Sequence, residues 1–141
     1  GLILRDKKVD PNEKQPGILI SHGYTGKKEK TFKYSIPLVL NGFTVLCMDL
    51  RGHGTSKAKG FDMDDIPSIM ADVKKEIDFL AQIENIDTNQ LMMIGHSMGA
   101  MATLSEGYAD PRLKIVVGMS GAYDLLDVYA PRRPHSGSIK Y

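Results

Sequence analysis

Several features that mark common protein classes are scarce or missing in this sequence. Only one of the 141 residues, Cys47, is a cysteine, which excludes an internal disulfide and a zinc site made of cysteines alone. A lone cysteine fits a reducing compartment, so we expect a cytoplasmic protein. No apolar run approaches the roughly 18 residues that a membrane-spanning helix needs. The chain begins with Gly1 rather than Met, so a signal or anchor upstream stays open.

Neither sign of charge is in excess. Lys and Arg total 18, Asp and Glu total 17, and a net charge of +1 gives no reason to expect a nucleic-acid partner. The lysine-rich run at residues 27–30 is interpreted as a solvated segment. Hydrophobic residues make up 42% of the chain, which is typical of a globular protein rather than a disordered one. No His/Asp/Glu cluster has metal-site spacing, and we expect no metal and no other cofactor.

Short apolar runs alternate with segments of helical spacing. The runs that predict strands are residues 2–4, 17–20, 43–48, 91–94 and 115–119. The segments that predict helices are residues 32–40, interrupted by Pro37, the long stretch 66–80, and Ser97 to about Ala109. Strands that are apolar on both faces and alternate with amphipathic helices indicate a mostly parallel sheet covered on both sides, a three-layer α/β sandwich. We expect this domain to cover residues 1–129 and residues 130–141 to form an irregular or disordered tail.

The segment Gly95-His96-Ser97-Met98-Gly99 directly follows an apolar run and opens a predicted helix. This is the setting of a G-x-S-x-G turn, which presents a nucleophilic serine. A serine hydroxyl is a weak nucleophile that has to be exposed beside a base, and the two glycines make room for a sharp turn. We predict that Ser97 is the nucleophile and that the Met98 N–H faces the anion formed on the substrate. The alternative is a glycine-rich turn that only packs tightly or binds a phosphate.

Two further glycine-rich loops follow predicted strands. Residues 21–26, SHGYTG, can aim a backbone N–H at the same point as Met98, and the alternative is an ordinary turn that needs glycine for its φ angles. Residues 49–56, DLRGHGTS, contain Asp49 and Arg51, which are candidates to pair and brace the loop. For this second loop we favour a structural role. Ligands of such sheets generally bind at the strand ends where these loops lie.

In their order along the chain, these motifs resemble the α/β-hydrolase superfamily. HGYTG, DLRGHGTS, GHSMG and SGAYDL each follow a predicted strand, and the similarity covers about Leu2 to Leu126. The nearest likeness is to esterases, monoacylglycerol lipases and serine aminopeptidases. The resemblance implies that Ser97 is the nucleophile and that the backbone N–H groups of Tyr24 and Met98 form the oxyanion hole. It also implies that three histidines are motif residues rather than the base, namely His22, His53 and His96.

In this family the acid and the base of the triad follow the nucleophile along the chain. Here 44 residues follow Ser97 (141 − 97), and they contain one recognisable strand. The sequence therefore resembles the N-terminal part of the fold, truncated after the strand at residues 115–119. Asp124 and His135 have the right order for an acid and a base, and the commoner interpretations are a turn or cap aspartate and a solvated tail histidine.

Together the motifs predict a serine hydrolase that cleaves a small-molecule carboxylic ester through an acyl-enzyme on Ser97. Two alternatives stay open: a peptidase or amidase of the same fold, and an incomplete fragment or binding module that lacks the acid and the histidine. If the sheet ends at residues 115–119, its apolar edge invites pairing with another chain. We therefore expect a dimer or larger assembly through that edge.

Overall fold

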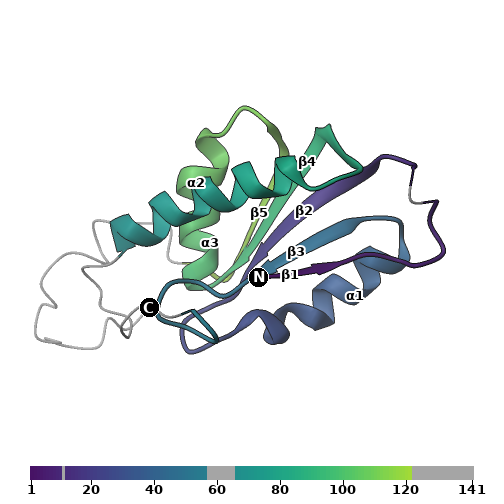
Figure 1. Ribbon diagram of the computed structural model, residues 1–141. Helices are drawn as coiled ribbons and strands as arrows, with labels where there is room; N and C mark the ends of the chain where they lie inside the picture. The colour runs from purple at the N-terminus through teal and green to yellow at the C-terminus, as the bar shows by residue number, and fades with distance from the viewer. Residues whose placement is uncertain (11, 57–65, 122–141) are drawn as a thin grey trace, which may run out of the picture.

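The computed structural model describes residues 1–10, 12–56 and 66–121, in which a sheet lies between two layers of helix (Figure 1). The sheet has five strands in the order β1-β3-β2-β4-β5. β1 runs antiparallel to β3, and the other neighbouring pairs are parallel. The strands are Leu2–Leu4 (β1), Gln15–Ser21 (β2), Thr44–Met48 (β3), Ile86–His96 (β4) and Leu113–Met119 (β5). The predicted three-layer α/β sandwich with a mostly parallel sheet is confirmed.

Helices cover both faces of the sheet. Helix α1 (Phe32–Leu40) lies on one face, and α2 (Ile66–Gln82) and α3 (Met98–Ala102) lie on the other (Figure 1). Crossovers between parallel strands are right-handed, so two crossovers that run in opposite directions across the sheet place their helices on opposite faces. Alternate strand residues therefore enter separate cores. Leu19 packs on the side of α2 and α3, whereas Ile18 packs on the side of α1.

Strand β2 is the point at which the strand order reverses. The chain moves from β2 to β3 on one side and then crosses back to β4 on the other side of β2. The loops after β2 and β4 consequently leave the sheet toward opposite faces, and a crevice opens between them at the carboxyl ends of the strands. This topology brings residues 21–26 next to residues 95–99, because Ser21 pairs with Gly95.

Helix α1 has the bounds that its apolar spacing predicts. A short 3-10 turn, η1 (Lys28–Thr31), precedes it, and Pro37 does not delay its start. The helix stops as predicted at Asn41-Gly42, where Gly42 has a φ of +87°. The amides of Gly42 and Phe43 donate to carbonyls of the last turn, at 3.1 and 3.2 Å. This glycine-dependent cap ends the helix just before β3.

Strand β4 begins at Ile86, earlier than the apolar run at 91–94 predicts. The added segment is largely polar, so it carries no strand signal of its own. Backbone pairing holds it in the sheet, since Gln15 pairs with Ile86 and Pro16 with Asp87, and a register shift follows between Pro16 and Gly17.

The helix predicted from Ser97 to about Ala109 is divided in the structure. Helix α3 is followed by a π-helical segment, η3 (Thr103–Gly107). The hydroxyl of Thr103 donates to the Gly99 carbonyl and that of Ser105 to the Met101 carbonyl, each at 2.8 Å. Hydroxyls that bond back to the preceding turn bend helices, which accounts for the irregular second half.

Candidate active site

Ser97 occupies a strained turn between β4 and α3. Its φ of +52° and ψ of −116° lie outside the usual regions for a residue with a side chain. Such a conformation costs on the order of 1–3 kcal/mol and persists only where the surroundings enforce it. Here the Ser97 N–H donates to the Met119 carbonyl at 2.8 Å, and the Ser97 carbonyl accepts from the Ala100 N–H at 2.9 Å. The sharp strand-to-helix turn predicted from G-x-S-x-G is therefore present.

The two glycines of this motif allow close backbone contacts. A Cβ on Gly95 would overlap the Gly99 carbonyl oxygen and the Thr103 hydroxyl. A Cβ on Gly99 would lie 2.6 Å from the carbonyl oxygens of Ser21 and His22. Glycine at position 95 thus lets the strand pack closely against the following turn, and glycine at position 99 lets the turn close against the end of β2.

The loop after β2 also contacts the serine turn through a glycine. A Cβ on Gly23 would lie 3.0 Å from Ser97 Cβ and 3.0 Å from His96 Nδ1. A pocket of about 410 Å³ opens beside this contact, and Tyr24 and Ser97 both line it. The structure therefore brings two of the predicted site residues to one cavity. Met98, the third, follows Ser97 directly, and its side chain is buried.

The predicted acid and base, Asp124 and His135, lie outside the described residues, as does the predicted tail 130–141. Within the described part of the chain, no hydrogen bond joins the Ser97 hydroxyl to a histidine. His22 Nδ1 lies 2.7 Å from the Gly23 carbonyl oxygen, and His53 Nδ1 lies 2.9 Å from the Arg51 carbonyl oxygen. Both rings therefore contact loop backbone through Nδ1.

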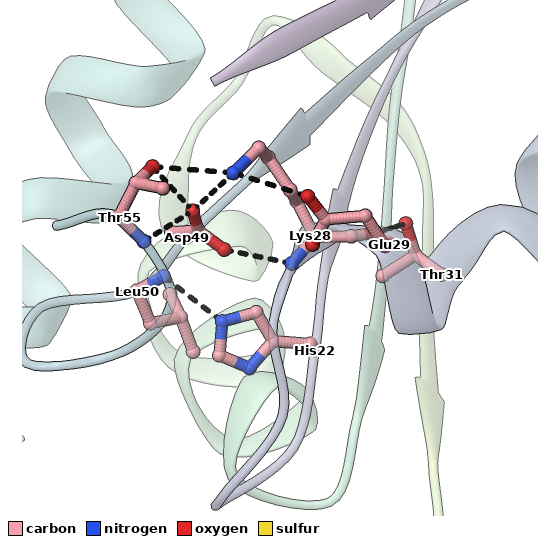
Figure 2. A network of polar contacts seen from close by, with 7 residues as sticks. All are labelled: His22, Lys28, Glu29, Thr31, Asp49, Leu50 and Thr55. Carbon is pink, nitrogen blue, oxygen red and sulfur yellow. Dashed lines mark hydrogen bonds and ion pairs between the residues drawn. The ribbon is translucent and has the colours of Figure 1, made fainter.

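The sequence-based pairing of Asp49 with Arg51 is wrong. Asp49 instead bonds to Lys28, whose Nζ and backbone N–H lie 2.6 and 2.7 Å from its carboxylate, and to Thr55 (Figure 2). Arg51 pairs with Asp72 of α2 through two hydrogen bonds of 2.9 Å. The end of β3 lies beside the end of β2, so Asp49 reaches Lys28 of the neighbouring loop as well as Thr55 of its own loop.

Lys28 also differs from expectation, because it does not belong to a solvated run. Its side chain is 12% exposed and that of Asp49 is 3% exposed. Burial by itself would raise the pKa of Asp49, but the hydrogen bonds from Lys28 and Thr55 outweigh it and hold that pKa well below its usual range. The hydrogen bond to Asp49 likewise raises the pKa of Lys28. Both groups are therefore charged, and the pair joins the loops after β2 and β3.

Sequence reasoning missed this pair, although one signal for it exists. Gly54 has a φ of +53°, and a Cβ there would overlap the Asp49 carboxylate. The loop after β3 therefore closes around the Asp49 carboxylate. Its glycines are the sequence signal, because a tight turn of this kind needs residues without a Cβ. Nothing in the run of residues 27–30 distinguishes Lys28 from its neighbours.

Two negative findings concern only residues 1–10, 12–56 and 66–121. No helix there combines the length and the apolar character needed to cross a membrane. These residues also contain no group of three or more His, Cys, Asp or Glu side chains that could hold a metal ion.

Comparison with protein families gives a match over most of the chain. The model of the family described as serine aminopeptidase, S33, matches residues 12–134. Among individual proteins, Hydrolase LUC6 of Fusarium sp. is 31% identical over 127 residues, which are 86% of this chain and 30% of that protein. Methylesterase 17 of Arabidopsis thaliana is 25% identical over 80% of this chain and 40% of its own length. The chain thus spans less than half the length of these relatives.

Solved structures show the same fold at lower identity. The α/β hydrolase GrgF from Penicillium sp. sh18 superimposes with a TM-score of 0.73 at 19% identity, over 81% of this chain and 40% of that one. Est1E from Butyrivibrio proteoclasticus, solved with bound ferulic acid, has a TM-score of 0.67 at 23% identity, over 77% of this chain and 42% of that one. The architecture is accordingly that of part of an α/β-hydrolase.

Proposed function

The chain belongs to the serine aminopeptidase S33 family of α/β-hydrolases, and on that premise we propose that it is a serine hydrolase acting on small-molecule carboxylic esters. The observation that supports this most is the backbone of Ser97. A serine with positive φ at the end of a central parallel strand, in contact with the glycine loop of the neighbouring strand, presents its hydroxyl to the crevice where ligands bind.

In the proposed reaction Ser97 Oγ attacks the ester carbonyl while a base takes its proton. The tetrahedral oxyanion is stabilised by the backbone N–H groups of Tyr24 and Met98. It collapses to an acyl-enzyme as the alkoxide leaves with a proton, and water then attacks the acyl group to release the carboxylic acid and regenerate Ser97. His135 is the proposed base and Asp124 its acid, unless both come from a part of the protein beyond this chain.

Labelling by a fluorophosphonate tests the nucleophile. The reagent should label the wild-type protein, and Ser97→Ala should abolish the labelling. Ser105→Ala is the matched control, because Ser105 follows in η3 and its hydroxyl is occupied by the Met101 carbonyl. Labelling that persists in Ser97→Ala, or a folded wild-type protein that is never labelled, would count against the proposed site.

A peptidase or amidase is the second candidate, and the description of the matching family favours it. Ester and amide hydrolysis share the nucleophile and the oxyanion hole, so the described residues serve both. A panel of p-nitrophenyl esters and aminoacyl p-nitroanilides separates the two, with Ser97→Ala as the blank. Faster turnover of the anilides would favour the peptidase.

An incomplete module without catalysis is the third candidate. The chain covers 30% to 43% of the length of its curated relatives, which is compatible with this interpretation. A module of this kind hydrolyses neither esters nor anilides above the Ser97→Ala blank. Turnover by the wild-type chain that Ser97→Ala lacks would exclude it.

We also propose self-association through β5. Among the described strands β5 lies at one end of the strand order, beside β4, and Ile115 and Val117 are 50% and 39% exposed. An apolar edge of this kind favours pairing with a second strand. Light scattering at high concentration should show a dimer or a larger species, and a monomer at every concentration would overturn the proposal.

A further inference from the structure

The peptide unit between Gly23 and Tyr24 is held from one side. Its carbonyl oxygen accepts two hydrogen bonds, from His22 Nδ1 at 2.7 Å and from the Gly26 N–H at 2.9 Å. In a trans peptide the C=O and the N–H point in opposite directions. Because the carbonyl is turned toward the His22 ring, the Tyr24 N–H is turned away from it. The contact of Gly23 with Ser97 Cβ places this peptide beside the serine.

The hydrogen bonds of His22 define its protonation state. The Leu50 N–H donates to His22 Nε2 at 3.1 Å, so Nε2 has to be an acceptor (Figure 2). The Gly23 carbonyl can only accept, so the proton is on Nδ1. The ring is therefore neutral, and burial lowers its pKa in agreement with this. The other titratable groups that face the ring are His53, with ring centroids 5.2 Å apart, and the carboxylates of Asp49 and Glu29.

We propose that His22 is a positioning residue, which keeps the Gly23–Tyr24 peptide oriented so that the Tyr24 N–H faces the oxyanion formed at Ser97. This inference rests on the proposed function, since it assigns a role within the same site. The ring nitrogens of His22 are both used by backbone, at the Gly23 carbonyl and the Leu50 N–H, so His22 acts through the peptide.

The Lys28–Asp49 pair also helps to hold the Gly23–Tyr24 peptide in place. The segment that carries Tyr24 is attached to the loop after β3 at both ends, through His22 to the Leu50 N–H and through Lys28 to Asp49 (Figure 2). Between these points the Gly26 N–H donates to the Gly23 carbonyl at 2.9 Å, which closes the turn that contains Tyr24. Two anchors and the hydrogen-bonded turn between them hold the peptide in one orientation before substrate arrives, which oxyanion stabilisation requires.

Three variants and one control test the proposal. His22→Leu removes both hydrogen bonds of the ring, whereas His22→Asn keeps a donor near the position of Nδ1 and is the conservative rescue. Gly26→Ala keeps the imidazole but places a Cβ 2.7 Å from the Gly23 carbonyl oxygen and 2.9 Å from His22 Nδ1, so it presses on the hydrogen bond between them. His53→Asn is the control, because it perturbs the adjacent buried ring, whose Nδ1 bonds to Arg51 rather than to Gly23. Each protein is first checked for folding by circular dichroism.

The first readout is the rate of fluorophosphonate labelling. We expect His22→Leu and Gly26→Ala to be labelled about 100-fold more slowly, as for loss of an oxyanion-hole donor. His22→Asn should recover most of the rate, and His53→Asn should lose far less than His22→Leu. Equal losses in His22→Leu and His53→Asn, or a folded His22→Leu protein labelled at the wild-type rate, would overturn the proposal.

The second readout needs no activity. In ¹H–¹⁵N spectra, acidification that protonates His22 puts a proton on Nε2 against the Leu50 N–H, so the Leu50 and Tyr24 amide signals should shift together with the ring titration. His22→Asn should remove that joint shift, and His22→Leu should speed exchange of the Tyr24 amide proton. If these amide effects occur while wild-type protein is never labelled, the proposed function fails and the positioning role stands. If the Tyr24 amide ignores both the titration and the variants, the positioning role is wrong.

Discussion

Two buried carboxyl groups, those of Asp49 and Glu76, line one pocket but differ in their hydrogen bonds. The two residues are 8% and 6% exposed, and both line that pocket together with Arg51 and Asp72. Asp49 accepts four hydrogen bonds from Lys28 and Thr55. Glu76 Oε2 has no hydrogen-bond partner among the described residues.

The pKa values of the two groups differ accordingly. Donors around Asp49 hold its pKa far below the usual range, whereas burial, together with the charge of Asp72, raises the pKa of Glu76 to about 8. Asp49 is thus ionised and joins two loops of the candidate site, and Glu76 is neutral at pH 7 and joins nothing that the structure describes. Similarly low solvent exposure therefore accompanies opposite pKa shifts, because donors surround the Asp49 carboxylate whereas Glu76 has none among the described residues that offset the cost of burial.

Asp49→Asn should have the largest effect on stability, because it removes the nearer of the two carboxylates that Lys28 contacts and leaves only that of the exposed Glu29, at 3.4 Å. Each hydrogen bond lost from an ionised group costs about 1.5–3 kcal/mol, and the amide nitrogen of Asn cannot accept the bonds that an Asp49 oxygen accepts from Lys28 and Thr55. Urea unfolding measures this as a lower midpoint. A midpoint equal to that of wild type would mean that the pair is solvated and that the contrast with Glu76 is false.

Glu76→Gln should change the pH dependence of stability. The unfolded state releases the Glu76 proton near the ordinary glutamate pKa of 4.5, but the folded state keeps it up to about pH 8. Stability should therefore fall as pH rises through this window and level off above pH 8. Between pH 5 and 7 the loss is at most about 2.7 kcal/mol. Unfolding curves across this range should show the slope in wild type and lose it in Glu76→Gln, and an equal slope in both would contradict the neutral buried acid.

Gly54→Ala should cost less, about 1–3 kcal/mol, because Gly54 has a φ of +53° and a Cβ there would press on the Asp49 carboxylate. Gly42→Ala is the matched control, since Gly42 has a φ of +87° but lies against open space. The excess loss of Gly54→Ala over Gly42→Ala in thermal unfolding measures the contact with Asp49. No excess would show that the loop does not close on the carboxylate.

Asp72→Asn should have the smallest effect, within about 1 kcal/mol, because the Arg51 and Asp72 side chains are 35% and 26% exposed. Added salt should reduce the difference from wild type further. The substitution also removes the negative charge that helps to raise the pKa of Glu76, so the upper end of the Glu76 stability window should move to lower pH. A shift to higher pH would contradict this assignment.

Much of the fold was predictable because its signals are local. Buried parallel strands are continuous apolar runs, and β2, β3 and the core of β4 follow them. The amphipathic spacing of α2 and the glycine cap of α1 are equally local. The start of β4 and the π-helical segment η3 were missed, because a backbone register and hydroxyl back-bonds produce them without an apolar pattern.

The candidate site divides in the same way. The Ser97 turn was predictable because its geometry needs glycines at fixed neighbouring positions. The partners of Asp49 were not, since Lys28 is 21 residues away and meets Asp49 through the pairing of β2 with β3. The role proposed for His22 likewise depends on Leu50, 28 residues away.

By itself the sequence determined the fold class, the order of the elements and the serine at the end of β4, because hydrophobic period and glycine spacing act over a few residues. The tertiary structure alone decided which polar groups meet. The reversal of strand order at β2 gathers the ends of β2, β3 and β4 at one edge of the sheet. For a buried carboxyl group, the hydrogen bonds it receives decide its charge. Asp49 receives them and is ionised, whereas Glu76 Oε2 receives none among the described residues and the group is neutral.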